Sequence, residues 1–308
     1  MRSLFESPTV ATVTESLLQY RAEQKLKAPP IKRGSRQEEL PLSFGQQRLW
    51  FLDQLPPGNP AYNIPAVVRL KRALNVAVLE QTFQEIIKRH EALRTTFNSG
   101  EGRPTQIIIS SFNFTLPIVN LRELSQAERE AEAMRLAAEE ARQPFDLTKW
   151  PLLCVTLLHL DETEYLLLLT VHHIVADDWS MGVVVREVAA LYEAFCSGKP
   201  SPLPELSVQY ADYAVWQIKW LQGEVLEAKL ADWKQQLGQI LPPLQLPAKQ
   251  PRSAVSSNQA EIQNFQLSWQ LSETINALIL QQNVTLFIYD LVGSTSNAAL
   301  SLQKSRRY

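Results

Sequence analysis

The fold is decided by the stretch LLCVTLLHLDETEYLLLLTVHHIVADDWS, which spans residues 152–180. Its two apolar runs, residues 152–160 and 165–171, are separated by only a few polar residues, so we predict two neighbouring antiparallel strands. Neither run alternates cleanly between apolar and polar residues, which is typical of strands buried on both faces. After the second run, apolar residues recur at helical spacing, as at Val184 and Val188. This order of strand, strand, loop and helix predicts an α/β fold.

Two adjacent histidines, His172 and His173, stand where the second strand ends. Alternate residues of a strand face opposite sides, so one ring should enter the core and the other should face a cleft beside the loop. An imidazole titrates near pH ~6.5, so at neutral pH it is mostly a free base that accepts a proton or holds an amine. The alternative is a hydrogen-bonded core histidine without a chemical role. A metal site of His173 and Asp177 is disfavoured, because a strand end and a loop do not share a helical face.

Further signals extend the α/β pattern toward the N-terminus. Asn75 is expected to cap a helix that carries one apolar stripe. Residues 95–97 and 106–109 flank a glycine-containing turn and predict a hairpin. Ser125 and Glu128 have the spacing of a capping box at the start of a long, alanine-rich helix.

Composition and charge exclude several classes of protein. The 308 residues carry a formal net charge of −2, which provides no basic field for nucleic acid. The apolar runs are too short to cross a bilayer, and the first residues lack the apolar core of a signal peptide. Cys154 and Cys196 are expected to be free thiols, without a disulfide framework or a thiolate metal site. We therefore predict a cytoplasmic protein with no nucleic-acid partner and no membrane partner.

The histidine segment resembles a family signature. Condensation domains of nonribosomal peptide synthetases carry the pattern HHxxxDG, usually followed by Trp-Ser, and the chain matches it from His172 to Ser180. The similarity extends from about Leu40 to Phe287. Three further stretches resemble other motifs of the family, in the family's order: LSFGQQRLWFLDQL at residues 42–55, RHEALRTTF at 89–97 and YADYAVWQ at 210–217.

The resemblance implies the fold of chloramphenicol acetyltransferase, with two αβ-sandwich lobes, each a mixed sheet flanked by helices, and a tunnel between them. It also implies acyl transfer that forms an amide: the amine of an acceptor aminoacyl thioester attacks the carbonyl of a donor acyl or peptidyl thioester. Both substrates would be carried on phosphopantetheine arms, so the chain itself would bind no cofactor covalently. The implied partners are the donor and acceptor carrier domains and other synthetase modules.

The resemblance also implies roles for individual residues. His173, the second histidine, becomes the candidate catalytic residue, either as a general base or as the hydrogen bond that orients the amine. An ion pair between Asp177 and Arg94 is expected to support the loop. Trp179 and Trp50 are expected to pack in the interior. The supporting set is His172, Asp177, Arg94, Trp179 and Ser180.

One position departs from the family pattern. The chain has Asp178 where the family has the glycine of its signature. Glycine often supplies a backbone conformation that other residues disfavour, so the effect of Asp178 on activity is open. Two residues further on, Ser180 is expected to be the N-cap of the following helix.

The resemblance also predicts a domain organisation. Residues 1–24 resemble the last helix of a carrier domain, and the charged, proline-containing residues 25–39 read as a linker. Residues 40–222 are expected to form the N-terminal lobe, and residues 223–257 a crossover linker. Residues 258–308 look like an incomplete start of the second lobe, which predicts a truncated, frameshifted or split synthetase.

Two other hypotheses remain beside amide formation. An epimerising or ester-forming relative would share both histidines. An inactive fragment would at most dock carrier domains, because an active site between two lobes is incomplete in one. The motifs do not identify the amino acids that are joined, the peptide product or the oligomeric state.

Overall fold

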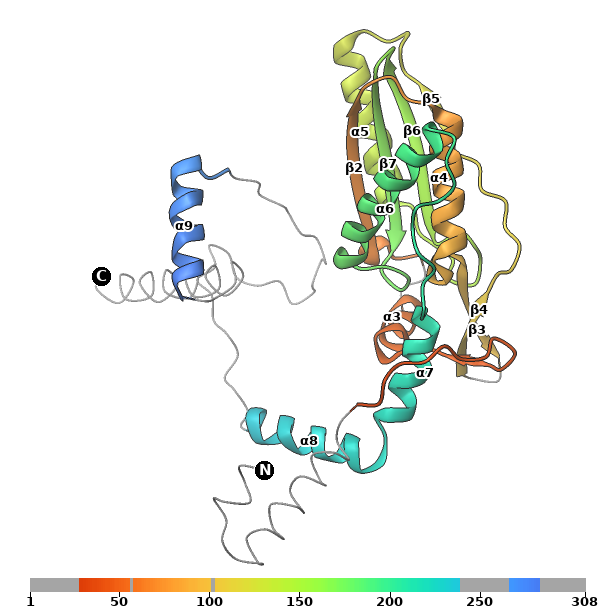
Figure 1. Cartoon of the computed structure of the whole chain (residues 1–308), viewed down its shortest axis with the longest axis vertical. Helices are drawn as coiled ribbons and strands as arrows, with labels where there is room; N and C mark the ends of the chain where they lie inside the picture. The colour runs from red at the N-terminus through yellow and green to blue at the C-terminus, as the bar shows by residue number, and fades with distance from the viewer. Residues whose placement is uncertain (1–27, 56–57, 101–102, 239–265, 283–308) are drawn as a thin grey trace, which may run out of the picture. The chain divides into compact units, whose positions relative to one another are not determined.

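The computed structural model of the chain describes residues 28–55, 58–100, 103–238 and 266–282. The helix expected over residues 1–24 therefore lies outside the described residues. The chain divides into two units, Met1–Asp232 and Trp233–Tyr308. The first unit contains an α/β lobe, in which helices flank a sheet of long strands (Figure 1).

The main sheet has the strand order β2-β7-β6-β5. Strands β6 (Leu153–Asp161) and β7 (Glu164–His172) form the antiparallel pair predicted from the two apolar runs. The edge strand β2 (Asn63–Lys71) runs antiparallel to β7, whereas the short β5 (Ile118–Asn120) runs parallel to β6. The sheet is therefore mixed, which confirms the predicted fold class.

Helices cover both faces of this sheet (Figure 1). Helices α4 (Val76–Arg89) and α6 (Asp178–Cys196) pack on one face over the larger hydrophobic core, and α5 (Gln126–Arg142) packs on the other face over a smaller one. Every residue of β7 after Glu164 is buried, as its unbroken apolar run predicts. A strand between two helical layers has no polar face, so its register is strongly specified.

The predicted caps form. The Asn75 side chain accepts a hydrogen bond from the Val78 amide at the start of α4, and Ser125 and Glu128 make a complete capping box at the start of α5. Since each cap satisfies backbone donors that the helix leaves free, it fixes where the helix begins. The apolar stripe of α4 is buried in the larger core through Leu79, Phe83, Ile86 and Ile87.

A second, smaller sheet stands beside helices α3 (Phe44–Gln54) and α7 (Tyr210–Trp220). Its order is β1-β4-β3, and the antiparallel pair β3 (Thr95–Gly100) and β4 (Arg103–Ile108) is the predicted hairpin. The short strand β1 (Leu40–Pro41) completes the sheet. Two short 3-10 helices, η1 (Pro60–Tyr62) and η2 (Glu91–Arg94), lead into β2 and β3.

Two helices follow the lobe in sequence. Helix α8 (Gly223–Leu237) occupies the first part of the predicted crossover linker, residues 223–257, so that part is helical. Helix α9 (Trp269–Gln282) lies within residues 258–308, which were expected to begin the second lobe. Neither these two helices nor the other described ones are long and apolar enough to span a membrane.

The packing of β6 predicts a contrast between two paired residues. Leu157 is fully buried, and its partner across the sheet, Ile118, is 52% exposed. Leu157→Ala should lower the free energy of unfolding by about 2–5 kcal/mol, because it leaves a cavity in the core. Ile118→Ala, the matched control, should cost less than about 1 kcal/mol. Urea unfolding of both variants measures the difference, and equal losses would contradict this account of the core.

Candidate functional site

The end of β7 sends the two histidines in different directions. His172 is the last β7 residue and pairs with Asn63 of β2. The His173 amide donates to the Tyr62 carbonyl (2.8 Å), so the chain leaves the sheet edge in a fixed direction. His172 is 1% exposed, whereas His173 is an exposed residue. The predicted divergence of the two rings is therefore confirmed.

His172 is a core residue. Its ring lies 6.1 Å from the Phe145 ring and 6.5 Å from the Tyr62 ring, measured between centroids. Its Nδ1 atom accepts a hydrogen bond from the Ile174 amide (3.1 Å), so the ring proton of the neutral form is on Nε2. Burial, followed by the nearby His173, lowers the pKa of His172 to about 4. At neutral pH this imidazole is uncharged and holds the loop.

The His173 ring is oriented by the loop. Its Nδ1 atom lies 2.9 Å from the carbonyl oxygen of Ala176. Because a carbonyl only accepts, Nδ1 carries the proton and Nε2 carries the lone pair of the neutral ring. Among the described residues, none forms a hydrogen bond to this Nε2 atom. The ring thus presents a basic nitrogen that is available to a ligand.

A recess of about 190 Å³ lies beside His173. The first turns of three helices border it: α3 contributes Gly45 and Gln46, α6 contributes Ser180, and α7 contributes Tyr210. The N-terminal end of a helix carries a partial positive charge. Asp177, whose carboxylate is ionised, also lines the recess, so its negative charge offsets these partial positive charges.

Two motifs that are distant in sequence meet at this recess. The Tyr210 hydroxyl and the Ser43 hydroxyl are 3.0 Å apart, and Gln46 donates to the Ile174 carbonyl (3.4 Å). Burial raises the pKa of Tyr210, so its hydroxyl stays protonated at neutral pH. Sequence reasoning included Gln46 and Tyr210 in family-like motifs but assigned them no role. Only the fold brings them to within reach of the histidine loop.

Comparison with known proteins identifies the family. Residues 36–304 match the model of the condensation domain. The chain belongs to the condensation-domain family. A linear gramicidin synthase of Brevibacillus parabrevis is 46% identical over 289 residues, which are 94% of this chain and 6% of that protein. Chondramide synthase cmdD of Chondromyces crocatus is 45% identical over 81% of this chain and 6% of that protein. The expected resemblance to peptide synthetases is confirmed.

Solved condensation-type domains share the fold. The X-domain from teicoplanin biosynthesis, solved in complex with OxyB, has a TM-score of 0.70 and 30% identity, over 84% of this chain and 56% of that chain. The starter condensation domain of rhizomide synthetase RzmA has a TM-score of 0.61 and 23% identity, over 67% of this chain and 47% of that chain. The chain thus spans about half of these solved domains and a small part of the synthetases.

Asp177 of the condensation signature is a helix cap. Its carboxylate accepts hydrogen bonds from the Ser180 amide (2.8 Å) and the Ser180 hydroxyl (2.5 Å). These bonds lower the pKa of Asp177. The expected ion pair with Arg94 is wrong: Arg94 donates to the Ile109 carbonyl (2.7 Å) and lies 3.8 Å from Glu91. Local capping prevails because its donors are three residues away, and Ser180 is the third helical residue instead of the expected cap.

Two neighbouring positions of the signature, Asp178 and Trp179, lie in the first turn of α6. Asp178, which replaces the family's glycine, is the first residue of α6 and has helical backbone geometry. The position therefore needs no left-handed conformation, and a carboxylate there suits the helix N-terminus. Trp179 is 81% exposed, so its expected packing role in the interior is wrong for this lobe. Trp50 is partly buried against the larger core, as expected.

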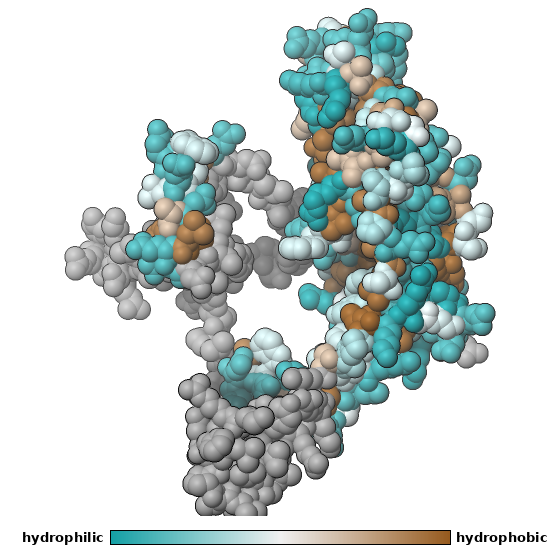
Figure 2. Space-filling model, in the orientation of Figure 1, coloured by the Kyte–Doolittle hydropathy of each residue, from teal (hydrophilic) through white to brown (hydrophobic). Residues whose placement is uncertain are grey.

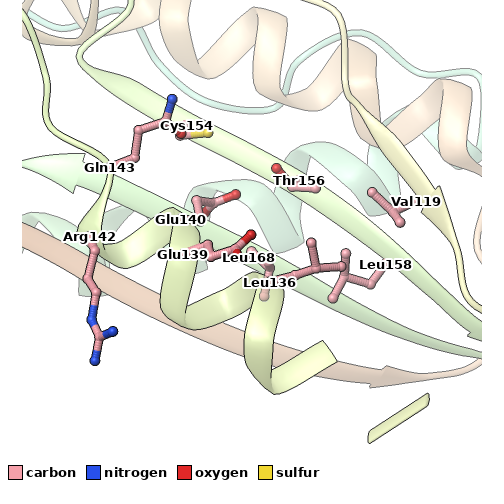
Figure 3. Close-up of a pocket in the computed structure, with 10 residues that line it drawn as sticks. All are labelled: Val119, Leu136, Glu139, Glu140, Arg142, Gln143, Cys154, Thr156, Leu158 and Leu168. Atoms are coloured by element: carbon pink, nitrogen blue, oxygen red, sulfur yellow. The ribbon is translucent and has the colours of Figure 1, made fainter. Parts of the chain in front are cut away.

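A larger groove lies on the other face of the sheet, between α5 and strands β5, β6 and β7 (Figure 3). Its volume is about 520 Å³, with Leu158 and Leu168 among its apolar residues and Glu139 and Glu140 projecting from α5. Cys154 lines it, and burial raises the pKa of this thiol to about 11. The thiol is therefore protonated at neutral pH and a poor nucleophile. The described residues also hold no cluster of three or more metal-ligating side chains.

The lowered pKa of His172 predicts a pH effect on stability. Folding lowers this pKa from 6.5 to about 4, so the folded chain binds the proton less readily than the unfolded chain. The free energy of unfolding should fall by at most about 3 kcal/mol as the pH drops from about 6.5 to about 4, and the contribution should be complete above that range. Urea midpoints across this range should fall more steeply for the wild type than for His172→Gln. Parallel curves would contradict the assignment.

The cap formed by Asp177 predicts a modest loss of stability. Asp177→Ala should lower the free energy of unfolding by about 0.5–2 kcal/mol, because the α6 amides lose their acceptor. In a double-mutant cycle with Arg94→Ala, the two losses should add to within about 0.5 kcal/mol. A coupling energy well above that value would instead support an ion pair between Asp177 and Arg94.

Proposed function

We propose that the chain provides the histidine-bearing lobe of an amide-forming condensation site in a nonribosomal peptide synthetase. The observation that carries this proposal is the His173 ring beside a recess, with Nδ1 bonded to a backbone carbonyl and no hydrogen bond to Nε2 from any residue that the structure describes. Family membership and the synthetase relatives support the reaction class. The substrates would be a donor acyl or peptidyl thioester and an acceptor aminoacyl thioester, each on the phosphopantetheine arm of a carrier domain.

The proposed reaction needs a proton acceptor. An α-amine has a pKa of about 8, so at neutral pH much of it is ammonium and unreactive. The free amine attacks the thioester carbonyl, the new C–N bond forms and the C–S bond breaks. The amine gives up one proton, and the departing thiolate of the donor arm takes up one. His173 Nε2 is in the correct form to accept the first proton or to hold the amine by a hydrogen bond.

The first turns of α3, α6 and α7 border the recess in which this step would occur. During attack, negative charge develops on the carbonyl oxygen and then on the sulfur. The partial positive charge at the helix ends would favour that charge, and the Asp177 carboxylate in the same recess would oppose it. Holding two tethered substrates together can supply a larger part of the rate than proton transfer does. Residual activity without the imidazole is therefore compatible with the proposal.

The complete site would need further partners. The chain spans 56% of the teicoplanin X-domain chain. A second condensation-domain lobe is one proposed partner of the site. Apolar side chains reach the surface of the lobe (Figure 2), and exposed ones include Phe44, Phe51, Trp179 and Tyr210. Carrier domains are the proposed transient partners. Both cysteines are free thiols, which is compatible with reaction in the cytoplasm.

Replacement of His173 tests the proposal. Amide formation between two loaded carrier domains would be measured with the full chain and the second lobe of the gramicidin synthase relative added as a separate polypeptide. His173→Ala should lower the rate by about 10²–10⁴-fold at unchanged stability, because the ring is exposed. His159→Gln, at the other end of the β6–β7 hairpin, should leave the rate unchanged.

The products of this assay separate the alternatives. An inverted stereocentre or an ester in place of the amide would assign the chain to a relative within the same superfamily. No product with folded protein would favour a fragment that only docks carrier domains. Full activity of His173→Ala would contradict the proposed role of the imidazole.

A further inference from the structure

The segment that precedes the lobe is bonded to it along its length. Residues 28–39, here named the N-terminal strap, contain no helix or strand and were expected to form part of a linker. The indole N–H of Trp216 donates to the Pro29 carbonyl (2.6 Å). The Gly34 amide donates to Asp212 (2.8 Å). The donor Trp216 and the acceptor Asp212 both belong to α7, so this one helix bonds the strap at two points.

The strongest contact is an arginine held by two acids. The Arg36 guanidinium lies 2.6 Å from the Asp212 carboxylate and 2.8 Å from the Glu91 carboxylate. The Asp212 side chain is 0% exposed and the Glu91 side chain 9%, while Arg36 is 25% exposed. A carboxylate that is removed from water requires a charged or hydrogen-bonding partner. Here the cation is supplied by the strap.

The hydrogen-bond donors around Asp212 stabilise its charged form. Burial acts to raise its pKa, but the hydrogen bonds from Arg36 and from the Gly34 and Gln209 amides lower it overall. Asp212 is therefore an anion at neutral pH and is surrounded by donors. Removal of Arg36 would leave a buried negative charge with backbone amides alone.

The proposed reaction does not use these two acids. Glu91 lies in RHEALRTTF and Asp212 in YADYAVWQ, and neither lines the recess beside His173.

Helix α7 also carries a row of aromatic rings. The ring centroids of Tyr213 and Trp216 are 5.6 Å apart, and those of Trp216 and Trp220 are 5.0 Å apart. A tryptophan N–H that bonds a proline carbonyl is a contact typical of surfaces that bind extended, proline-containing segments.

We propose that α7 and η2 form a docking surface for the N-terminal strap, and that this surface fixes the point from which an upstream carrier domain is tethered. The proposal rests on the proposed function for the identity of the upstream domain. With the strap docked, residues 28–39 are removed from the tether. At full extension these residues would span about 40 Å. The tether then starts beside α7, the helix whose first residue, Tyr210, lines the recess.

Docking by itself can be tested without catalysis. In the full chain, amide hydrogen exchange at Gly34 should be slow, and Arg36→Ala should accelerate it about tenfold or more. Cleavage by trypsin after Lys32 and Arg33 should accelerate as well. Lys32→Ala is the matched control, because this exposed strap residue forms no hydrogen bond or ion pair with α7 among the described residues, and it should leave Gly34 exchange unchanged. Unprotected Gly34 in the wild type would overturn the proposal.

Two further measurements separate undocking from unfolding. Amides of β7 should keep their protection in Arg36→Ala, since the sheet core does not include the strap. Trp216→Phe keeps an aromatic ring but removes the N–H donor to Pro29, so it should raise exchange in the strap by a smaller factor. Loss of β7 protection together with that of the strap in both variants would show a general loss of structure and overturn the proposal.

The tether itself can be tested with a carrier domain attached before residue 25. Fluorescence energy transfer between a dye on the carrier and a dye on α6 should give a narrow distance distribution in the wild type and a broader one in Arg36→Ala. Equal widths would overturn the tethering role. Failure of amide formation with a docked strap would count against the proposed function alone, because none of these measurements depends on catalysis.

Discussion

Burial of β7 on both faces is the constraint on which the rest of the lobe depends. Helices α4 and α6 cover one face and α5 covers the other, so every side chain after Glu164 must fit a specified position. A shift by one residue would place each side chain in the wrong layer. The strand therefore ends at a defined point, with His172 in the core and His173 outside it.

The loop after β7 orients the side chain that forms the candidate site. Backbone bonds from Tyr62 and Ala176 hold His173 at its amide and at Nδ1, while the Asp177 cap sets the start of α6. The same few residues thus orient the imidazole and fix the residue at which α6 begins. Within this segment Asp177 and Ser180 satisfy each other locally, whereas the buried Nε2 atom of His172 has no hydrogen-bond partner among the described residues.

Two carboxylates of the lobe illustrate different uses of charge. Asp177 bonds its own helix, remains near the surface and is stabilised by short local contacts. Asp212 is fully buried and depends on Arg36, which is distant in sequence. The first kind of contact forms wherever the helix forms. The second kind requires the folded lobe, so it ties the strap to the completed tertiary structure.

The sequence by itself determined the α/β class, the β6–β7 hairpin, the caps at Asn75 and Ser125, and the divergence of the histidines, because each depends on neighbours in the chain. It could not determine the partner of Asp177 or the surroundings of Trp179. Charge attraction suggested Arg94, but in the fold Arg94 bonds Ile109 and lies near Glu91. Only the tertiary structure decided that Tyr210 meets the recess and that Arg36 meets Asp212, since such contacts depend on how distant segments pack and not on local spacing.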